Sequence, residues 1–274
     1  GDKVSLQDGA VSFSQSDVVL ATNSALRVSI GRKSTTQKQW SSPQFPVFGF
    51  GWDLDVPYMM GTYDSRDGWN AWNPANPSAG RCTAGTFAPR ERVGPWPYYY
   101  TQTIYAHMYW NGVNINIPGY GQELALKSNA AQTMPTDGNT YQGTTKSQWR
   151  IGCLPTIKNG AGEGFIVKMP DGVTYHFDWM VTRKAVDLTD NNSVDAQGNG
   201  LDPWHLLAPL SDVYLYATKA IDRFGNTITY TYDQSSPNRI TRIQSSDGAQ
   251  LDINYNASGL VSTITVGSRT WTYA

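Results

Sequence analysis

The sequence contains no hydrophobic run that approaches the roughly eighteen residues of a membrane-spanning helix. It also has little charge: 16% of the 274 residues are charged, and 21 Lys and Arg nearly balance 22 Asp and Glu. No basic run is longer than a pair such as Arg32-Lys33, whereas nucleic-acid binding usually requires a stripe of positive charge that displaces counterions. We therefore predict neither a membrane span nor a nucleic-acid partner.

The local signatures of several enzyme classes are missing as well. There is no HExxH, no paired CxxC and no GxSxG, so the usual motifs of zinc proteases, zinc ribbons and α/β-hydrolases are absent. His107, His176 and His205 are far apart in the sequence. His176 lies between Tyr175 and Phe177, so on a strand it points away from the apolar side. We interpret the histidines as structural or exposed, and we expect no cofactor and no enzymatic activity.

Cysteine is scarce, since Cys82 and Cys153 are the only two. A disulfide between them would close a loop of about seventy residues and would stabilise the fold by roughly 4 kcal/mol in the chain-entropy model. Two free, buried thiols, which are common in cytosolic proteins, are the simpler interpretation. The sequence leaves the disulfide open as the alternative.

Aromatic and turn-forming residues are abundant instead. Aromatic side chains make up 12% of the chain, alongside 26 Gly and 15 Pro. Few stretches place Glu, Lys, Ala and Leu at helical spacing, whereas Tyr, Trp and Thr favour strands. We predict an all-β fold built from antiparallel sheet, with little helix. A chain of this length can bury a large core.

Apolar residues alternate with polar or small ones along much of the chain, which predicts strands. The expected strands lie within residues 4–31 (three short strands), 48–56, 113–117, 165–169 and 173–177. Pro170-Asp171-Gly172 is a turn signal that makes the last two strands a hairpin. Polar or Gly- and Pro-rich stretches predict loops at residues 32–46, 61–100, 127–147 and 187–202.

The final fifty residues repeat one pattern. Ile228, Tyr230 and Tyr232 alternate with threonines, which predicts a half-buried strand. Two further alternating strands follow, and each of the three strands is preceded by a turn signal, at Gly225-Asn226, Asp247-Gly248 and Gly267-Ser268. The units end in Tyr232, Tyr255 and Tyr273. Such a repeat predicts stacked hairpins that extend a single sheet.

Three motifs in this region belong together: Asp222-Arg-Phe-Gly225-Asn226, Tyr230-x-Tyr232-Asp233 and Tyr255-Asn256-x-x-Gly259. They resemble the tyrosine–aspartate (YD) repeat of bacterial RHS proteins, although Asn256 stands where the repeat usually has Asp. Two upstream motifs, Gly49-Phe-Gly-Trp52 and Pro170-Asp-Gly-Val-Thr-Tyr-His-Phe-Asp178, are similar to the region that precedes the repeats in those proteins.

The resemblance implies a pre-repeat β region at residues 1–212 and YD repeats at 213–274, joined in one continuous sheet without a flexible linker. In RHS proteins such a sheet spirals into a hollow shell, often around a toxic C-terminal segment. The implied partners are the remainder of the same chain, its toxin segment and components of a secretion machine. The implied location is secreted or at the bacterial cell surface. The self-cleaving DPxGL motif of these proteins is not matched at Asp202-Pro203, which continues Trp-His-Leu.

Other interpretations of the same residues lead to different functions. Trp69, Trp72, Trp96 and Trp110 could form a platform on which sugars stack, as in a surface adhesin or carbohydrate-binding module, or they could be core residues. Asp53 and Asp55 share one strand face, so they are a candidate carboxylate pair of a glycosidase. The same spacing also arises from ordinary alternation on a solvent-facing strand.

Asp195, Gln197 and Asn199 partly match the first half of a calcium loop. Leu206 replaces the acidic residue expected at the twelfth position, so an exposed polar loop is the simpler interpretation. Finally, the strand at residues 270–273 has no successor in the repeat. We therefore expect it to present an exposed sheet edge with some tendency to self-associate.

Overall fold

The computed structural model describes residues 2–4, 11–35, 47–49, 51–69, 80–85, 87–95, 101–129, 132–190 and 205–273. Across these residues the protein is almost entirely antiparallel β-sheet, and the prediction of an all-β fold is confirmed. The helical content of these ranges is the single 3-10 turn η2 (Ala106–Met108). None of the described segments forms a helix long and apolar enough to cross a membrane.

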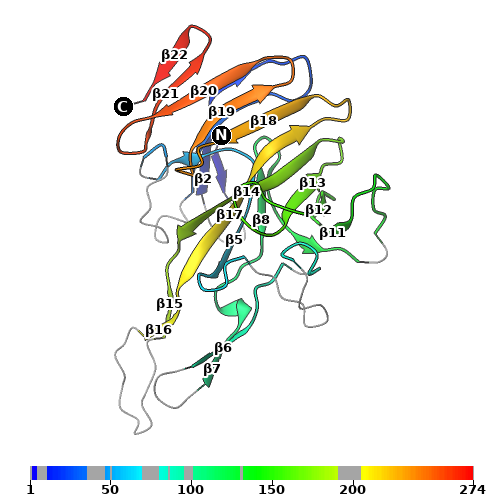
Figure 1. Cartoon of the computed structure of the whole chain (residues 1–274), viewed down its shortest axis with the longest axis vertical. Helices are drawn as coiled ribbons and strands as arrows, with labels where there is room; N and C mark the ends of the chain where they lie inside the picture. Colours follow the sequence, from blue (N-terminus) through cyan, green and yellow to red (C-terminus); the bar gives the residue numbers. More distant parts are fainter. Residues whose placement is uncertain are drawn as a thin grey trace.

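One large sheet of 14 strands organises the molecule. Figure 1 shows β18–β22 fanning across the top of the molecule and β11–β13 to the right. The strands of this sheet are β5 (Tyr58–Asp64), β8 (Asn114–Ile117), β9 (Gly121–Leu124), β10 (Leu126–Lys127), β11 (Tyr141–Thr144), β12 (Arg150–Leu154), β13 (Gly164–Lys168), β14 (Thr174–Lys184), β17 (Leu210–Ile221), β18 (Thr227–Tyr232), β19 (Ile240–Ser245), β20 (Gln250–Tyr255), β21 (Val261–Val266) and β22 (Arg269–Thr272).

The large sheet branches at β17. One edge of β17 pairs with β14 along nearly its whole length. The other edge is divided, since residues 210–216 pair with β5 and residues 219–221 pair with β18. At the division the Ala217 amide donates to the Pro57 carbonyl at 3.0 Å. Nine consecutive residues of β17 are buried, as expected for a strand covered on both faces.

A smaller sheet packs against the repeat strands. It contains β1 (Asp2–Val4), β2 (Val11–Leu20), β3 (Val28–Thr35) and β4 (Asp53–Leu54). Val28 and Ile30 of β3 are almost fully buried and belong to the same core as Ile243 and Leu251 of the repeat strands. Two short hairpins complete the described elements: β6 (Arg92–Pro95) with β7 (Thr101–Ile104), and β15 (Leu188–Asp190) with β16 (His205–Ala208).

The predicted hairpins match the structure closely. β13 and β14 pair as expected, with Phe165 opposite Phe177 and Val167 opposite Tyr175. The expected strands at the N-terminus correspond to β1, β2 and β3, and the one at residues 113–117 to β8.

The strand expected at residues 48–56 is largely wrong. Among the described residues of that range, Asp53–Leu54 alone form a strand, because Gly49 and Gly51 adopt φ values of +93° and +80°, which turn the chain. The loops expected at 61–100 and 127–147 also contain strand: the first holds the end of β5 and all of β6, and the second holds β11.

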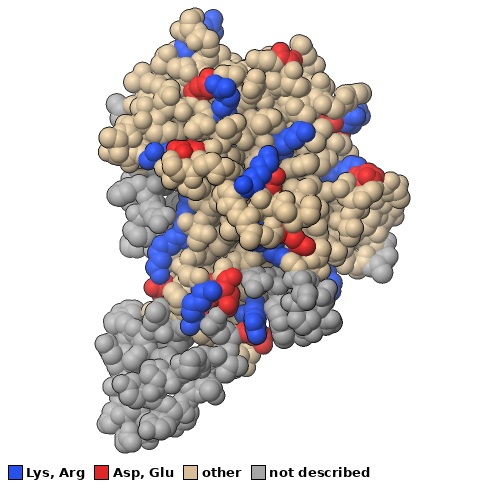
Figure 2. Space-filling model, in the orientation of Figure 1, with Lys and Arg blue, Asp and Glu red and all other residues tan. Residues whose placement is uncertain are grey.

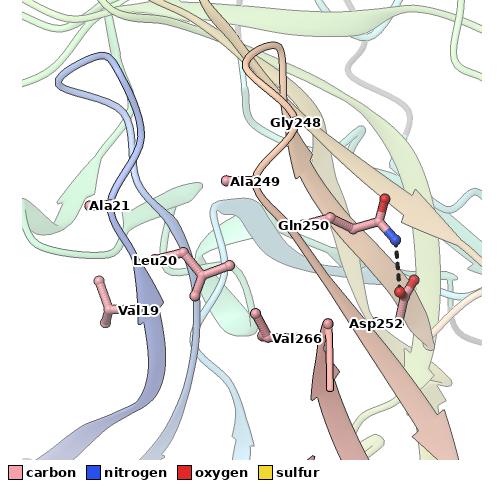
Figure 3. Close-up of a pocket in the computed structure, with 9 residues that line it drawn as sticks. Val19, Leu20, Ala21, Gly248, Ala249, Gln250, Asp252 and Val266 are labelled. Carbon is pink, nitrogen blue, oxygen red and sulfur yellow. Dashed lines mark hydrogen bonds between the residues drawn. The ribbon is translucent and has the colours of Figure 1, made fainter. Parts of the chain in front are cut away.

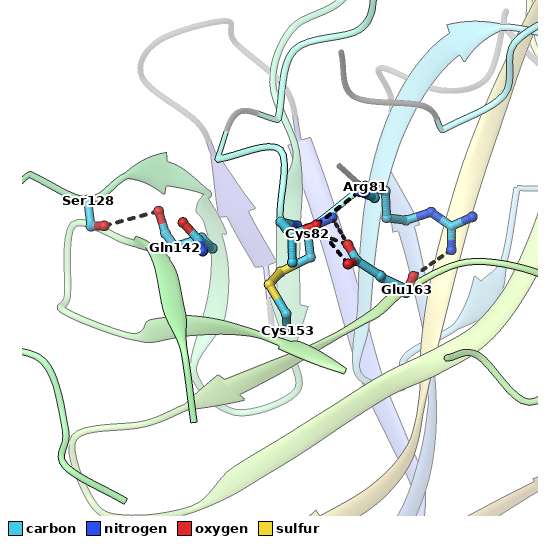
Figure 4. Close-up of a disulfide and its surroundings, with 8 residues drawn as sticks. Arg81, Cys82, Ser128, Gln142, Cys153 and Glu163 are labelled. Atoms are coloured by element: carbon cyan, nitrogen blue, oxygen red, sulfur yellow. Dashed lines mark hydrogen bonds between the residues drawn. A yellow bond between two sulfur atoms is a disulfide. The ribbon is translucent and has the colours of Figure 1, made fainter. Parts of the chain in front are cut away.

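The two cysteines are joined, which is the alternative that the sequence left open. The Cys82–Cys153 disulfide has a Cα–Cα separation of 5.5 Å and links a turn at residues 80–85 to β12 (Figure 4). Glu163 holds the same turn, because its carboxylate accepts from the amides of Cys82 at 2.8 Å and Thr83 at 2.9 Å. Arg81 adds a bond to the Glu163 carbonyl at 2.6 Å.

Candidate functional site

Four hairpin turns of the large sheet share one geometry. In each, the first residue's amide donates to the carbonyl of the fifth residue, and the fourth residue's amide donates back to the carbonyl of the first. The fourth residue is always a glycine with φ between +81° and +94°. The turns span residues 169–173, 222–226, 245–249 and 256–260. This is a three-residue hairpin loop that ends in a left-handed glycine, which explains why Gly172, Gly225, Gly248 and Gly259 are glycines.

Acidic or amide side chains stabilise the repeat turns by accepting hydrogen bonds from backbone amides of the same turn. The Asp222 Oδ1 atom accepts from the amides of Phe224 at 2.8 Å and Asn226 at 2.9 Å. The Asn256 Oδ1 atom accepts from the Leu260 amide at 3.0 Å, four residues on, as Asp222 does from Asn226. The hydrogen bond from the Asn226 side chain lowers the pKa of Asp222. Asp247 and Asp233 accept in the same manner from Ala249 and Ser235, respectively.

Two of the three repeat tyrosines are anchors. The Tyr232 hydroxyl donates to the Ala217 carbonyl at 2.8 Å, and the Tyr255 hydroxyl donates to the Ile240 carbonyl at the same distance. Each acceptor lies 15 residues before its tyrosine. The ends of β18 and β20 are therefore bound to earlier parts of the sheet by the same kind of hydrogen bond. Tyr230 is half-buried against the core.

Tyr273 departs from this arrangement. Its ring lies 5.4 Å from Phe48 and 5.7 Å from the Arg32 guanidinium, so it contacts the small sheet. Burial and the nearby Asp17 carboxylate raise the pKa of Tyr273 to about 12. The last tyrosine therefore links the repeat strands to β2 and β3.

Asp53 forms an ion pair between the two sheets. The Arg183 Nη1 atom lies 2.5 Å from the Asp53 carboxylate, and Arg183 also donates to the Tyr216 hydroxyl at 2.8 Å. The Arg183 guanidinium lies 4.7 Å from the ring centroid of Tyr214. Burial alone would raise the pKa of Asp53, but Arg183 outweighs it and the net shift is downward. Asp53 is thus held as an ionised carboxylate paired with Arg183, which does not suit the proton-donating acid of a glycosidase.

Asp55, the other acid of the candidate pair, is paired with an amide. The Asn116 Nδ2 atom lies 3.4 Å from the Asp55 carboxylate. The contact between Asp53 and Arg183 was missed because the two residues are 130 positions apart. Neither alternation nor a local motif relates residues at that separation.

The tryptophans do not form an exposed platform as far as they are described. Trp69 is 4% exposed and stacks on Tyr63 at 5.2 Å, with Phe165 at 5.4 Å. It is a core residue and presents no free ring face to a sugar. Trp110 is half-buried against the same core. Trp72 and Trp96 lie outside the described residues.

The three histidines lie on different elements: η2, β14 and β16. His107 is exposed and stacks on Tyr105 at 5.4 Å. His176 is half-buried, and burial lowers its pKa. His205 begins β16. Within the described ranges no group of His, Cys, Asp or Glu could hold a metal ion. The calcium candidates Asp195, Gln197 and Asn199 lie outside those ranges.

A surface groove of about 630 Å³ runs between the end of β2 and the β20–β21 strands (Figure 3). Leu20 and Val266 make part of it apolar, and Gln250 donates to Asp252 along its polar side at 2.7 Å. On the face shown in Figure 2, basic and acidic side chains are interspersed, without a wide area of one sign.

No protein-family model matches the sequence, and no curated protein matches it either.

Proposed function

We propose that this chain is a structural wall element of an RHS-like β-shell, which encloses a secreted effector or toxin segment and catalyses no reaction itself. The observation that carries the proposal is the recurrence of one turn and one tyrosine anchor along β17–β21. Three connections between β17 and β21 share this turn and two strand ends share this anchor, so the sheet lengthens by repeated use of the same contacts. A protein that extends a sheet in this way is suited to build a barrier.

The arrangement of the faces supports a barrier whose free surface is polar. The apolar side of the repeat strands is buried in the core, where Ile243, Leu251 and Ile264 are fully buried. The small sheet packs on that side. Thr229 and Thr231, on the opposite side of β18, are exposed. We infer that a passenger meets the polar, threonine-bearing side.

Limited proteolysis of the full translated polypeptide tests the proposal. We expect the enclosed segment to be cut only after the wall opens. The double variant Ile243→Asp/Ile264→Asp places charges in the buried side of the wall and should make the segment accessible. Leu124→Asp/Leu126→Asp is the matched control, because it adds the same charges at exposed side chains outside the repeat strands. Equal cleavage rates in the parent and the Ile243→Asp/Ile264→Asp variant would contradict enclosure.

A carbohydrate-binding function has less support, because the Trp69 ring is buried. A glycan array separates the two proposals. Reproducible binding that is lost in Trp110→Ala would favour the carbohydrate-binding module over the wall.

A further inference from the structure

Asn111 and Gly112 lie in the connection between η2 and β8, outside any strand or helix. The Asn111 side chain is exposed. In the described part of the chain, neither its amide group nor the backbone amide of Gly112 has a hydrogen-bond partner. Gly112 adopts a φ of +93°, in the left-handed region that glycine enters freely. This Asn-Gly pair is therefore exposed and is held by no hydrogen bond of its reactive groups.

Asn159-Gly160 is a second Asn-Gly pair, and its surroundings are the opposite. Asn159 is half-buried in the connection between β12 and β13. Its Nδ2 atom donates to the Met180 carbonyl at 2.7 Å, and its Oδ1 atom accepts from the Met180 amide at 2.8 Å. Both polar atoms of the side chain are therefore bound to β14. A third pair, Asn199-Gly200, lies outside the described residues.

An asparagine side chain can react with the backbone that follows it. The amide nitrogen of the next residue attacks the side-chain Cγ atom, so that a bond from nitrogen to Cγ forms. The bond from Cγ to Nδ2 breaks, and ammonia leaves with the proton of the backbone amide. Water then opens the cyclic imide at one of its two carbonyls and leaves aspartate or isoaspartate. A following glycine favours the attack, because no Cβ shields its nitrogen and its backbone rotates most freely, and asparagine is among the thermolabile residues of proteins.

We propose that Asn111 is a site of non-enzymatic deamidation in the folded protein, and that the fold protects Asn159 from the same reaction. At Asn111 the side chain is exposed and neither reacting group gives up a hydrogen bond. Asn159 must first break both bonds to Met180, and each hydrogen bond of this kind shifts an opening equilibrium by about fivefold. The proposal concerns this connection alone and does not rest on the enclosing function.

The modified residue lies where the chain enters the core. Trp110 packs against the core, and Val113 is fully buried with its carbonyl accepting from the Ala125 amide at 2.8 Å. Isoaspartate inserts an extra carbon into the backbone between these two fixed residues, whereas aspartate adds only a charge at an exposed position. We therefore expect isoaspartate to strain the start of β8 and aspartate to be tolerated.

Incubation followed by peptide mapping tests the proposal. The folded protein and a sample unfolded in urea are incubated at the same temperature, and mass spectrometry follows each asparagine separately. In the folded protein we expect Asn111 to convert at least about tenfold faster than Asn159. In urea the two should convert at similar rates, because the bonds to Met180 are lost. No conversion of Asn111 in the folded protein, equal rates there, or the same tenfold difference in urea would overturn the proposal.

Two variants separate the chemistry from its consequence. Asn111→Gln keeps an exposed amide but forms the corresponding ring much more slowly, so it should retain its Tm after incubation. Asn111→Asp carries the new charge on a normal backbone and should melt like the fresh parent. The incubated parent should melt at a lower temperature than both. Equal losses of Tm in the parent and in Asn111→Gln would overturn the assignment to Asn111, and an incubated parent that melts like the fresh one would refute the strain at β8.

Discussion

Removing the hydroxyl of a repeat tyrosine tests whether the anchors hold the repeat strands in place. The substitution Tyr232→Phe deletes the bond to the Ala217 carbonyl and keeps the ring. That ring stacks on Trp179 at 5.1 Å and lies 5.8 Å from Tyr216. The ring contacts survive in phenylalanine, so the variant isolates the hydrogen bond.

The expected magnitude follows from burial. Tyr232 is 7% exposed, so water cannot readily replace the lost donor. A net hydrogen bond contributes about 0.5–1.5 kcal/mol, and an unsatisfied buried partner costs about 1–3 kcal/mol. We expect Tyr232→Phe to lower the free energy of unfolding by about 1–2 kcal/mol. Tyr255 is half-buried, so Tyr255→Phe should cost about half as much.

Urea unfolding followed by tryptophan fluorescence provides the measurement. The free energy should fall without a change in the m-value, because both states keep their exposed surface. Tyr105→Phe is the control: Tyr105 is 42% exposed, and its variant should lie within about 0.5 kcal/mol of the parent. If Tyr232→Phe is as stable as that control, the hydrogen bond from the tyrosine hydroxyl to the carbonyl 15 residues upstream does not stabilise the fold, and the tyrosines are not anchors.

Three further predictions concern the ion pair, the disulfide and one turn. The pKa of Asp53 is lowered in the folded state, so its pairing with Arg183 stabilises the fold above the unfolded-state pKa of about 3.9 and is lost as pH falls through the folded value. Asp53→Asn should lower the free energy of unfolding by about 2–3 kcal/mol at pH 7 and by much less at pH 2.5. Urea unfolding at both pH values measures the two losses, and equal losses would contradict the pairing. Reduction of Cys82–Cys153, or its replacement by serines, should remove about 4 kcal/mol for a separation of 71 residues, and thermal melts that are unchanged by reductant would refute this. Gly248→Ala should lower the free energy of unfolding by about 1 kcal/mol, because the φ of Gly248 is +94°. Gly248→Asn should lower it by less, since asparagine tolerates left-handed backbone. Urea unfolding compares the two variants, and a larger loss for Gly248→Asn would contradict the turn geometry.

The repeat strands were predictable because their information is local. Alternation places Leu251 and Ile253 on the buried side of β20, as the sequence indicates. β19 escaped the same reasoning, since Ile240 and Ile243 are three residues apart. A register shift near Tyr232 puts both of them opposite inward-facing residues of β18. One extra residue in a bulge breaks the period of two on which alternation depends.

The candidate sites were less predictable for a different reason. Trp69 looked available because glycine and proline around it left its direction open, and only the contact with Phe165 of β13 places it in the core. Asp53 looked like a strand carboxylate until Arg183 of β14 approached it. Both outcomes depend on pairings between distant strands, whose register no local pattern encodes.

β17 determines the register at the centre of the large sheet. Three strands pair with it, and a one-residue slip there would turn nine buried side chains to the wrong face. β18, β19, β20 and β21 each pair with two neighbours, and among the described strands β22 pairs with β21 alone. The register of the repeat strands is therefore set one pairing at a time, outward from β17.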